Sequence, residues 1–343
     1  MYPELDTCFF IMHVLALILA LLVPASSGQD SAHKAIPSKQ SAIQEPGFIF
    51  WKMSRHSVDL LLDPVPQSNT LRFAQLKQTL TDLQCQRDHL HEQAFSEGLN
   101  LLCTLPATAL SKQYESQPGT NATGEAGIIL FLANYAHEGS GQSAIEDWSG
   151  AIMLPFLYHG LVAAPRYHTF LFAEVDGEAG ARALFDSLTP AQRRALRGVV
   201  ALDSLGLGPA EFYSNPNDTN GLRVIDTTNV TQACEWFPLC RALMHAAGDL
   251  RVDAPVYAIP GAWFRTDVTR EFRHHGVPCI VIHSVTFSTR DLPGSLRDTA
   301  QAIDHDRYFD TLTLLDDYAA ELDQPWMTPS SIAPSSPSRG RRR

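Results

Sequence analysis

The sequence has few positive charges and lacks the short motifs of several enzyme classes. It carries 26 Lys and Arg against 37 Asp and Glu, a formal net charge of −11, so we do not expect a nucleic-acid partner. The only basic cluster is residues 339–343, typical of a solvated tail. There is no Cys-Xaa-Xaa-Cys pair, which argues against a structural zinc site. Gly-Xaa-Ser-Xaa-Gly, His-Glu-Xaa-Xaa-His and a phosphate-binding glycine loop are also missing.

The composition is that of a folded protein. The chain has 343 residues, of which 45% are hydrophobic and 18% charged. This charge content is ordinary for a globular protein and too low for a disordered chain. The length suits one large α/β domain, or at most two small ones.

The N-terminal region predicts export. An apolar run over Cys8–Pro24 is followed by small residues up to Ser27, which indicates a signal peptide cleaved near Ser27. Glu4 and Asp6 precede the run without any Lys or Arg, so Met12 is an alternative start. The other interpretation is an uncleaved membrane anchor, for which the run is slightly short. We expect a secreted or periplasmic protein, with no membrane attachment unless this segment stays uncleaved.

Export permits disulfide bonds, and the mature chain keeps five cysteines, an odd number. We predict a disulfide between Cys234 and Cys240, because the intervening segment contains Pro238 and can turn. The alternative is that both are ordinary apolar cysteines on a helix.

Hydrophobic patterning divides the chain into a signal peptide (1–27), a linker and N-terminal segment (28–70), an α/β domain (71–323) and a disordered tail (324–343). Within the domain, buried strands alternate with amphipathic helices, which predicts helices sandwiching a mostly parallel central sheet. The expected strands are 127–132, Thr169–Val175, Gly198–Leu202 and Cys279–His283. The expected helices include Leu71–Cys85, Ala151–Ala163, Glu178–Leu188, Thr231–Ala247 and Asp306–Leu322.

The loop Ala133–Gly150 follows an expected strand and leads into a helix, the place where open α/β proteins carry their chemistry. Its segments 133–136 (Ala-Asn-Tyr-Ala) and 146–150 (Glu-Asp-Trp-Ser-Gly) resemble two blocks of the co-catalytic zinc aminopeptidases, metallopeptidase family twenty-eight. That family also holds glutaminyl cyclases and the transferrin receptor ectodomain. Its usual blocks are Ala-His-Tyr-Asp and, about a dozen residues after the His, Asp-Asn-Xaa-Ser-Gly.

The resemblance covers about Leu71 to Asp323 and implies the fold of that family, whose central sheet is mixed. It also implies a site at the carboxyl ends of the strands. There, two zinc ions would be held by histidines and carboxylates, and a Glu would act as general base. Several expected positions are changed in this sequence. The first His is Asn134, the bridging Asp is Glu146, the general base is Gly177 and the final His is Gly294, whereas Glu178 and Asp203 remain carboxylates.

Three further residues bear on the site. His137 could replace a lost ligand from a shifted position. Asp267 stands where the family has a Ser/Thr-Asp near the substrate pocket, the alternative being a surface helix. Arg265 lies beside it and could bridge two of the carboxylates.

The sequence therefore leaves two hypotheses. The first is a pseudoenzyme on a metallopeptidase fold that binds a peptide or a protein, with no cofactor expected although the family uses zinc. The second is an active zinc-dependent exopeptidase that holds its metal through Glu178, Asp203 and His137. We favour the first, because a lost general base and two lost histidines remove the proton acceptor and metal ligands together.

Overall fold

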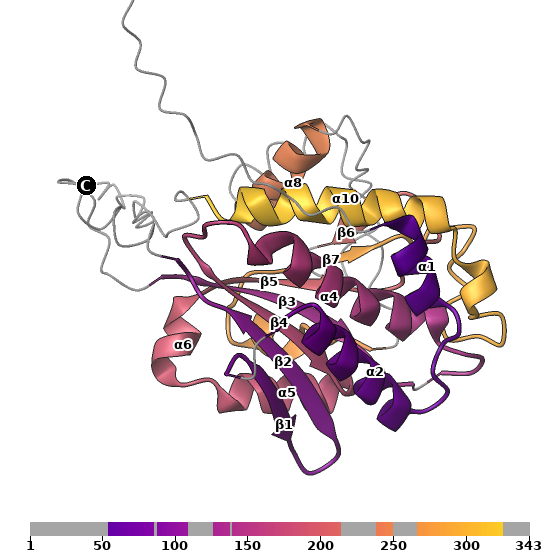
Figure 1. Ribbon diagram of the computed structural model, residues 1–343, viewed down its shortest axis with the longest axis horizontal. Helices are drawn as coiled ribbons and strands as arrows, with labels where there is room; N and C mark the ends of the chain where they lie inside the picture. The colour runs from indigo at the N-terminus through magenta and orange to yellow at the C-terminus, as the bar shows by residue number, and fades with distance from the viewer. Residues whose placement is uncertain are drawn as a thin grey trace, which may run out of the picture. The chain divides into compact units, whose positions relative to one another are not determined.

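A computed structural model describes residues 54–85, 88–108, 126–137, 139–213, 238–249 and 266–324. Its centre is a seven-stranded sheet in the order β1-β2-β4-β3-β5-β7-β6 (Figure 1). The strands are β1 (Leu90–Ala94), β2 (Leu99–Leu105), β3 (Ile128–Asn134), β4 (Thr169–Val175), β5 (Leu196–Leu202), β6 (Glu211–Tyr213) and β7 (Cys279–His283).

The predicted mixed α/β fold is confirmed, but parallel pairing, which we expected for most of the sheet, is found only at its centre. The pairs β3–β4, β3–β5 and β5–β7 are parallel, whereas β1–β2, β2–β4 and β6–β7 are antiparallel. Parallel pairing is thus confined to the four strands β4, β3, β5 and β7. These are the four strands expected from their continuous apolar runs, as befits strands buried on both faces.

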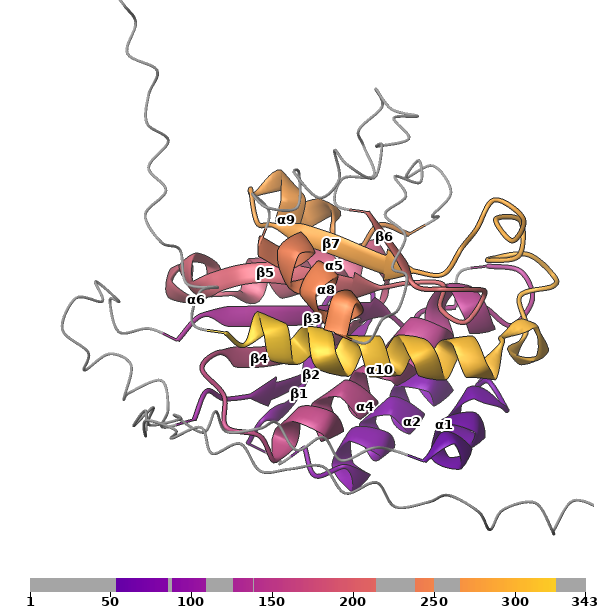
Figure 2. The same cartoon turned by 90° about the horizontal axis from the view of Figure 1, so that it is seen from above.

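Helices cover both faces of the sheet. One face packs on α1 (Arg55–Leu62), α2 (Asn69–Asp82), α4 (Ser149–Val162), α8 (Pro238–Asp249) and α10 (His305–Leu322). The other packs on α5 (Gly177–Ser187) and α9 (Arg270–His274), with α6 (Pro190–Ala195) leading into β5. Figure 2 shows α10 lying across the first face, where it contacts α4 and α8. Alternate strand residues enter the two cores, as a pleated sheet requires.

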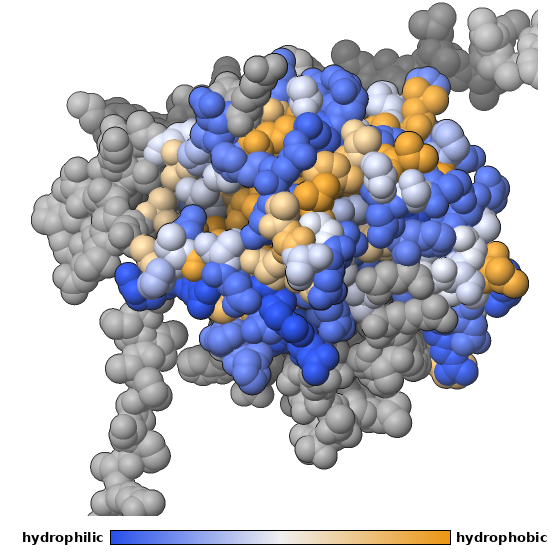
Figure 3. Space-filling view, turned by 90° about the horizontal axis from the view of Figure 1, so that it is seen from below, coloured by the Kyte–Doolittle hydropathy of each residue, from blue (hydrophilic) through white to orange (hydrophobic). Residues whose placement is uncertain are grey.

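Figure 3 views the molecule from below the orientation of Figure 1 and shows polar residues around apolar groups near the centre of the face in view. The described residues include no helix long and apolar enough to span a membrane.

One disulfide joins α2 to the sheet. Cys85 follows α2, and its bond to Cys103 of β2 closes a separation of 18 residues. Sequence patterns did not single out this pair. Cys240 is also disulfide-bonded, but Cys234 lies outside the described residues, so the predicted Cys234–Cys240 bond stays a prediction. Cys279 is a buried free thiol.

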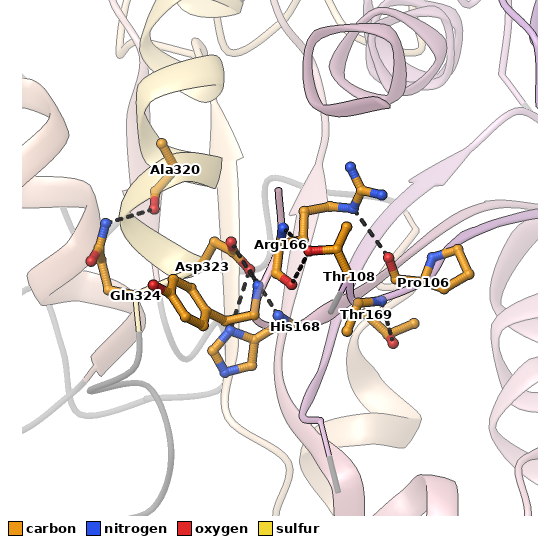
Figure 4. Close-up of polar contacts among 10 residues, drawn as sticks. Pro106, Thr108, Arg166, His168, Thr169, Ala320, Asp323 and Gln324 are labelled. Carbon is orange, nitrogen blue, oxygen red and sulfur yellow. Dashed lines mark hydrogen bonds and ion pairs between the residues drawn. The ribbon is translucent and has the colours of Figure 1, made fainter. Parts of the chain in front are cut away.

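A buried polar network anchors the last helix to the sheet, at the opposite end from the strand carboxyl ends. Asp323, the C-cap of α10, is fully buried. Its carboxylate accepts hydrogen bonds from the backbone N–H groups of Tyr167 and His168 and lies 3.5 Å from His168 Nδ1 (Figure 4). The nearby Arg166 donates to the carbonyl oxygens of Pro106 and Leu161.

Candidate functional site

The parallel strands bring the expected site residues to one edge of the sheet. Asn134 ends β3 and pairs with Val175, the last residue of β4. Asp203 directly follows β5, whose Leu202 pairs with Ala133. Gly177 begins α5, just beyond the end of β4. The carboxyl ends of three neighbouring strands therefore place these residues side by side, as the sequence led us to expect.

The amide of Asn134 is fully engaged in hydrogen bonds. Its Oδ1 accepts from the backbone N–H groups of Ala136 (3.0 Å) and Gly177 (2.9 Å). Its Nδ2 donates to Asp147 Oδ1 (2.7 Å). The side chain thus ties together the end of β3, the turn before α5 and the segment that carries Glu146.

That segment is a five-residue π-helix, η1 (Ala144–Trp148), which we did not expect from the sequence. Ser143 precedes it with a left-handed φ of 44°. Asp298, from the loop after β7, accepts hydrogen bonds from the N–H groups of Ile145 (2.6 Å), Glu146 (3.3 Å) and Gly294 (2.7 Å). A carboxylate at the start of a helix is stabilised by its unpaired N–H groups and its dipole.

Carboxylates crowd this edge. Burial raises the pKa of Asp203 to about 8. A hydrogen bond from Ser204 opposes this increase, whereas the negative charges of Glu146, Asp267 and Asp298 add to it. Burial also raises the pKa of Asp147 well above its ordinary value, and Glu146 adds to that shift. Buried like charges favour the neutral acid, so the crowding of carboxyl groups at this edge shifts Asp147 and Asp203 towards their protonated forms.

Glu178 is used to hold another segment in place. Its Oε1 accepts a hydrogen bond from the N–H of Asp267 (3.1 Å), and its Oε2 lies 3.6 Å from Arg270. Asp267 in turn bonds Thr269 and forms an ion pair with Arg273. Asp267 therefore lies just before α9, and its charge contributes to the raised pKa of Asp203. Arg265 lies outside the described residues.

Gly177 occupies the position of the expected general base with a φ of +68°. A left-handed backbone disfavours any side chain with a Cβ, and the penalty is about 1 kcal/mol. We therefore expect Gly177→Ala to lower the free energy of unfolding by about this amount, measured by urea denaturation. Gly180→Ala is not a clean control, because a Cβ there would meet Asn100 Oδ1 at 2.4 Å. Unchanged stability in Gly177→Ala would contradict this account of the backbone.

Of two other predicted positions, Gly294 lies near Glu146, whereas His137 lies beside Asn69. Gly294 also has a left-handed φ, 65°. A Cβ added at Gly139 would lie 3.0 Å from Gly294 Cα and 3.2 Å from Glu146 Oε2, so these three residues are close together. The backbone N–H of His137 donates to Asn69 Oδ1 (2.7 Å). The buried Nε2 of His137 has no hydrogen-bond partner within the described part of the chain.

Sequence reasoning missed Arg72, which lies against this loop. It is fully buried on α2 and donates to the carbonyl oxygens of Tyr135 (3.0 Å) and Gln142. The only available signal was an Arg within an otherwise apolar helical stripe. The contacts themselves span 63 and 70 positions of sequence.

The arrangement of strands and helices was compared with known structures. The fold is shared with glutaminyl cyclases and zinc aminopeptidases. A glutaminyl cyclase from an Acidobacteriales bacterium matches at 15% identity over 85% of this chain and 99% of that one, with a TM-score of 0.57. The Macrostomum lignano glutaminyl cyclase matches at 16% identity over 80% and 91%, with a TM-score of 0.56.

A zinc aminopeptidase from Bacillus subtilis matches at 13% identity over 68% of this chain, with a TM-score of 0.50. The match covers 53% of that enzyme, so this chain spans about half of its length. No protein-family model and no curated sequence matches the chain. At these identities the likeness shows the fold.

The expectation that no cofactor is required is contradicted by this comparison, because an enzyme with this fold is a zinc aminopeptidase. Zinc is therefore the metal to test. Among the residues that the structure describes, no three His, Cys, Asp or Glu side chains are grouped so that they could bind a zinc ion. Asn134 and Glu178 are instead bonded to protein groups, as described above.

Proposed function

We propose that this chain is a metallopeptidase-like protein that binds a peptide or a protein at the carboxyl edge of its sheet and does not hydrolyse peptides. The observation that carries the proposal is the hydrogen bonding of Asn134. An amide that accepts from two backbone N–H groups and donates to Asp147 serves as a structural clamp where a metal-binding histidine would be needed. Gly177 supplies no side chain to accept a proton from water.

The surface beside the site supports a binding role. The loop after β7 carries Asp298 and exposes two large apolar side chains, Phe287 (73% exposed) and Leu296 (82% exposed). Arg290 packs over the Phe287 ring at 4.3 Å. Exposed apolar side chains on a loop that also contributes to the site suit a ligand that brings apolar contact.

A second candidate is a zinc-dependent exopeptidase with a rewired site. Two observations favour it: the zinc aminopeptidase that shares the fold, and the buried Nε2 of His137, which lacks a hydrogen-bond partner within the described residues. The histidine would have to act together with carboxylates of this edge.

One assay separates the two candidates. Protein purified with added zinc should not cleave aminoacyl-nitroanilides, and it should not cyclise peptides that begin with glutamine, the activity named for two proteins of similar structure. Metal content is measured on the same sample. Peptide hydrolysis that is lost on chelation and in Asp203→Asn would overturn the proposed function and establish the second candidate.

We also propose that the protein is exported. The apolar N-terminal run and the buried Cys85–Cys103 disulfide support this, because such bonds persist in oxidising compartments. Expression with the native leader and N-terminal sequencing of the secreted product test it. Recovery of the chain only from cells, with its leader intact, would contradict export.

A further inference from the structure

Arg72 is a buried cation at the edge of the acidic site. It is fully buried, and its guanidinium bonds carbonyl oxygens: Nε to Pro66 (3.1 Å), Nη1 to Tyr135 (3.0 Å) and Nη2 to Gln142. The same group lies 5.7 Å from the ring centre of Trp148, in η1. A buried guanidinium keeps its charge and needs several acceptors at once.

The two carbonyls bonded by Nη1 and Nη2 lie at the two ends of one loop. Tyr135 directly follows β3, and Gln142 stands just before η1. Gln142 is also bonded to the loop after β7, because its N–H donates to the Asp298 carbonyl (2.8 Å). Its Oε1 accepts from the N–H of Ala300 (3.1 Å). Arg72 thus connects α2, the loop 135–142 and, through Gln142, the segment that carries Asp298.

We propose that Arg72 is the positioning residue of this site: its guanidinium holds the carbonyl groups of Tyr135 and Gln142 in place, so that the site is formed before a ligand arrives. The inference rests on the proposed function only in naming this edge a binding site. The hydrogen bonds of Arg72 stand without it.

The test compares Arg72→Met and Arg72→Lys with Arg166→Met. Arg166 is the matched control, because it is also buried and bonds backbone carbonyls, but at the opposite end of the sheet. Amide hydrogen exchange over residues 135–147 should speed up about tenfold or more in Arg72→Met. It should be partly restored in Arg72→Lys and unchanged in Arg166→Met. Equal exchange of this loop in the Arg72 and Arg166 variants would overturn the loop assignment.

If Arg72→Met does not fold, Arg72→Lys replaces it in the comparison with Arg166→Met, and unchanged exchange over residues 135–137 and 139–147 in Arg72→Lys would then overturn the loop assignment.

Discussion

Replacing Asp323 with alanine is expected to lower the free energy of unfolding by about 3 kcal/mol, the cost of removing one partner of a buried charged network. Two backbone N–H groups, those of Tyr167 and His168, would lose their acceptor inside the protein. The buried guanidinium of Arg166 would also lose a neighbouring negative charge. Urea denaturation at neutral pH measures the effect.

Two variants control this measurement. Asp323→Asn keeps one acceptor oxygen and should lose less stability than the alanine variant. Asp310→Ala removes an exposed carboxylate of the same helix, 4.0 Å from Arg307, and should change stability by less than about 0.5 kcal/mol. If the alanine variants at 323 and 310 behave alike, the network does not anchor α10.

Glu174→Met is expected to stabilise the protein by about 2 kcal/mol at neutral pH, because a buried polar group without a hydrogen bond costs about that much. Glu174 lies on β4 and is 1% exposed. Neither carboxyl oxygen has a hydrogen-bond partner within the described residues. Methionine has a similar length and suits the apolar surroundings. Chemical denaturation of both proteins at pH 7 measures the gain.

The pH dependence of that gain follows from the titration of Glu174. Burial raises its pKa well above the ordinary value of 4.5. The unfolded chain therefore releases this proton at lower pH than the folded chain does. Wild-type stability, relative to Glu174→Met, should fall as the pH rises above about 4.5 towards the raised folded pKa. A constant difference between pH 4 and pH 8 would show that the carboxyl does not titrate as its burial requires.

The sequence predicted the parallel core well because strands buried on both faces are continuous apolar runs. Ile128–Asn134, Thr169–Val175, Leu196–Leu202 and Cys279–His283 all stand within a few residues of the expected bounds. It also predicted that Asn134 and Asp203 would lie at the same edge of the sheet, since neighbouring parallel strands end there. What local patterns could not predict are contacts made across the chain.

The π-helix and the role of Asp298 illustrate that limit. Ala144–Trp148 has ordinary helical composition, and its geometry depends on a carboxylate that lies 153 positions from Ile145 in sequence. The same is true of Glu178, an expected metal-site carboxylate, whose hydrogen bond from Asp267 spans 89 positions. Side-chain partners at such separations leave no periodic signal.

The hydrogen bonds of Asn134 bear on how reversible this site is in evolution. A histidine at position 134 would have to give up the amide oxygen that accepts from both Ala136 and Gly177, leaving two buried N–H groups unpaired. The left-handed backbone at Gly177 likewise resists a glutamate. A histidine at position 134 and a glutamate at position 177 would therefore each cost stability on their own, so the residues now present at these two positions are entrenched: substitutions are expected to accumulate around them sooner than at them.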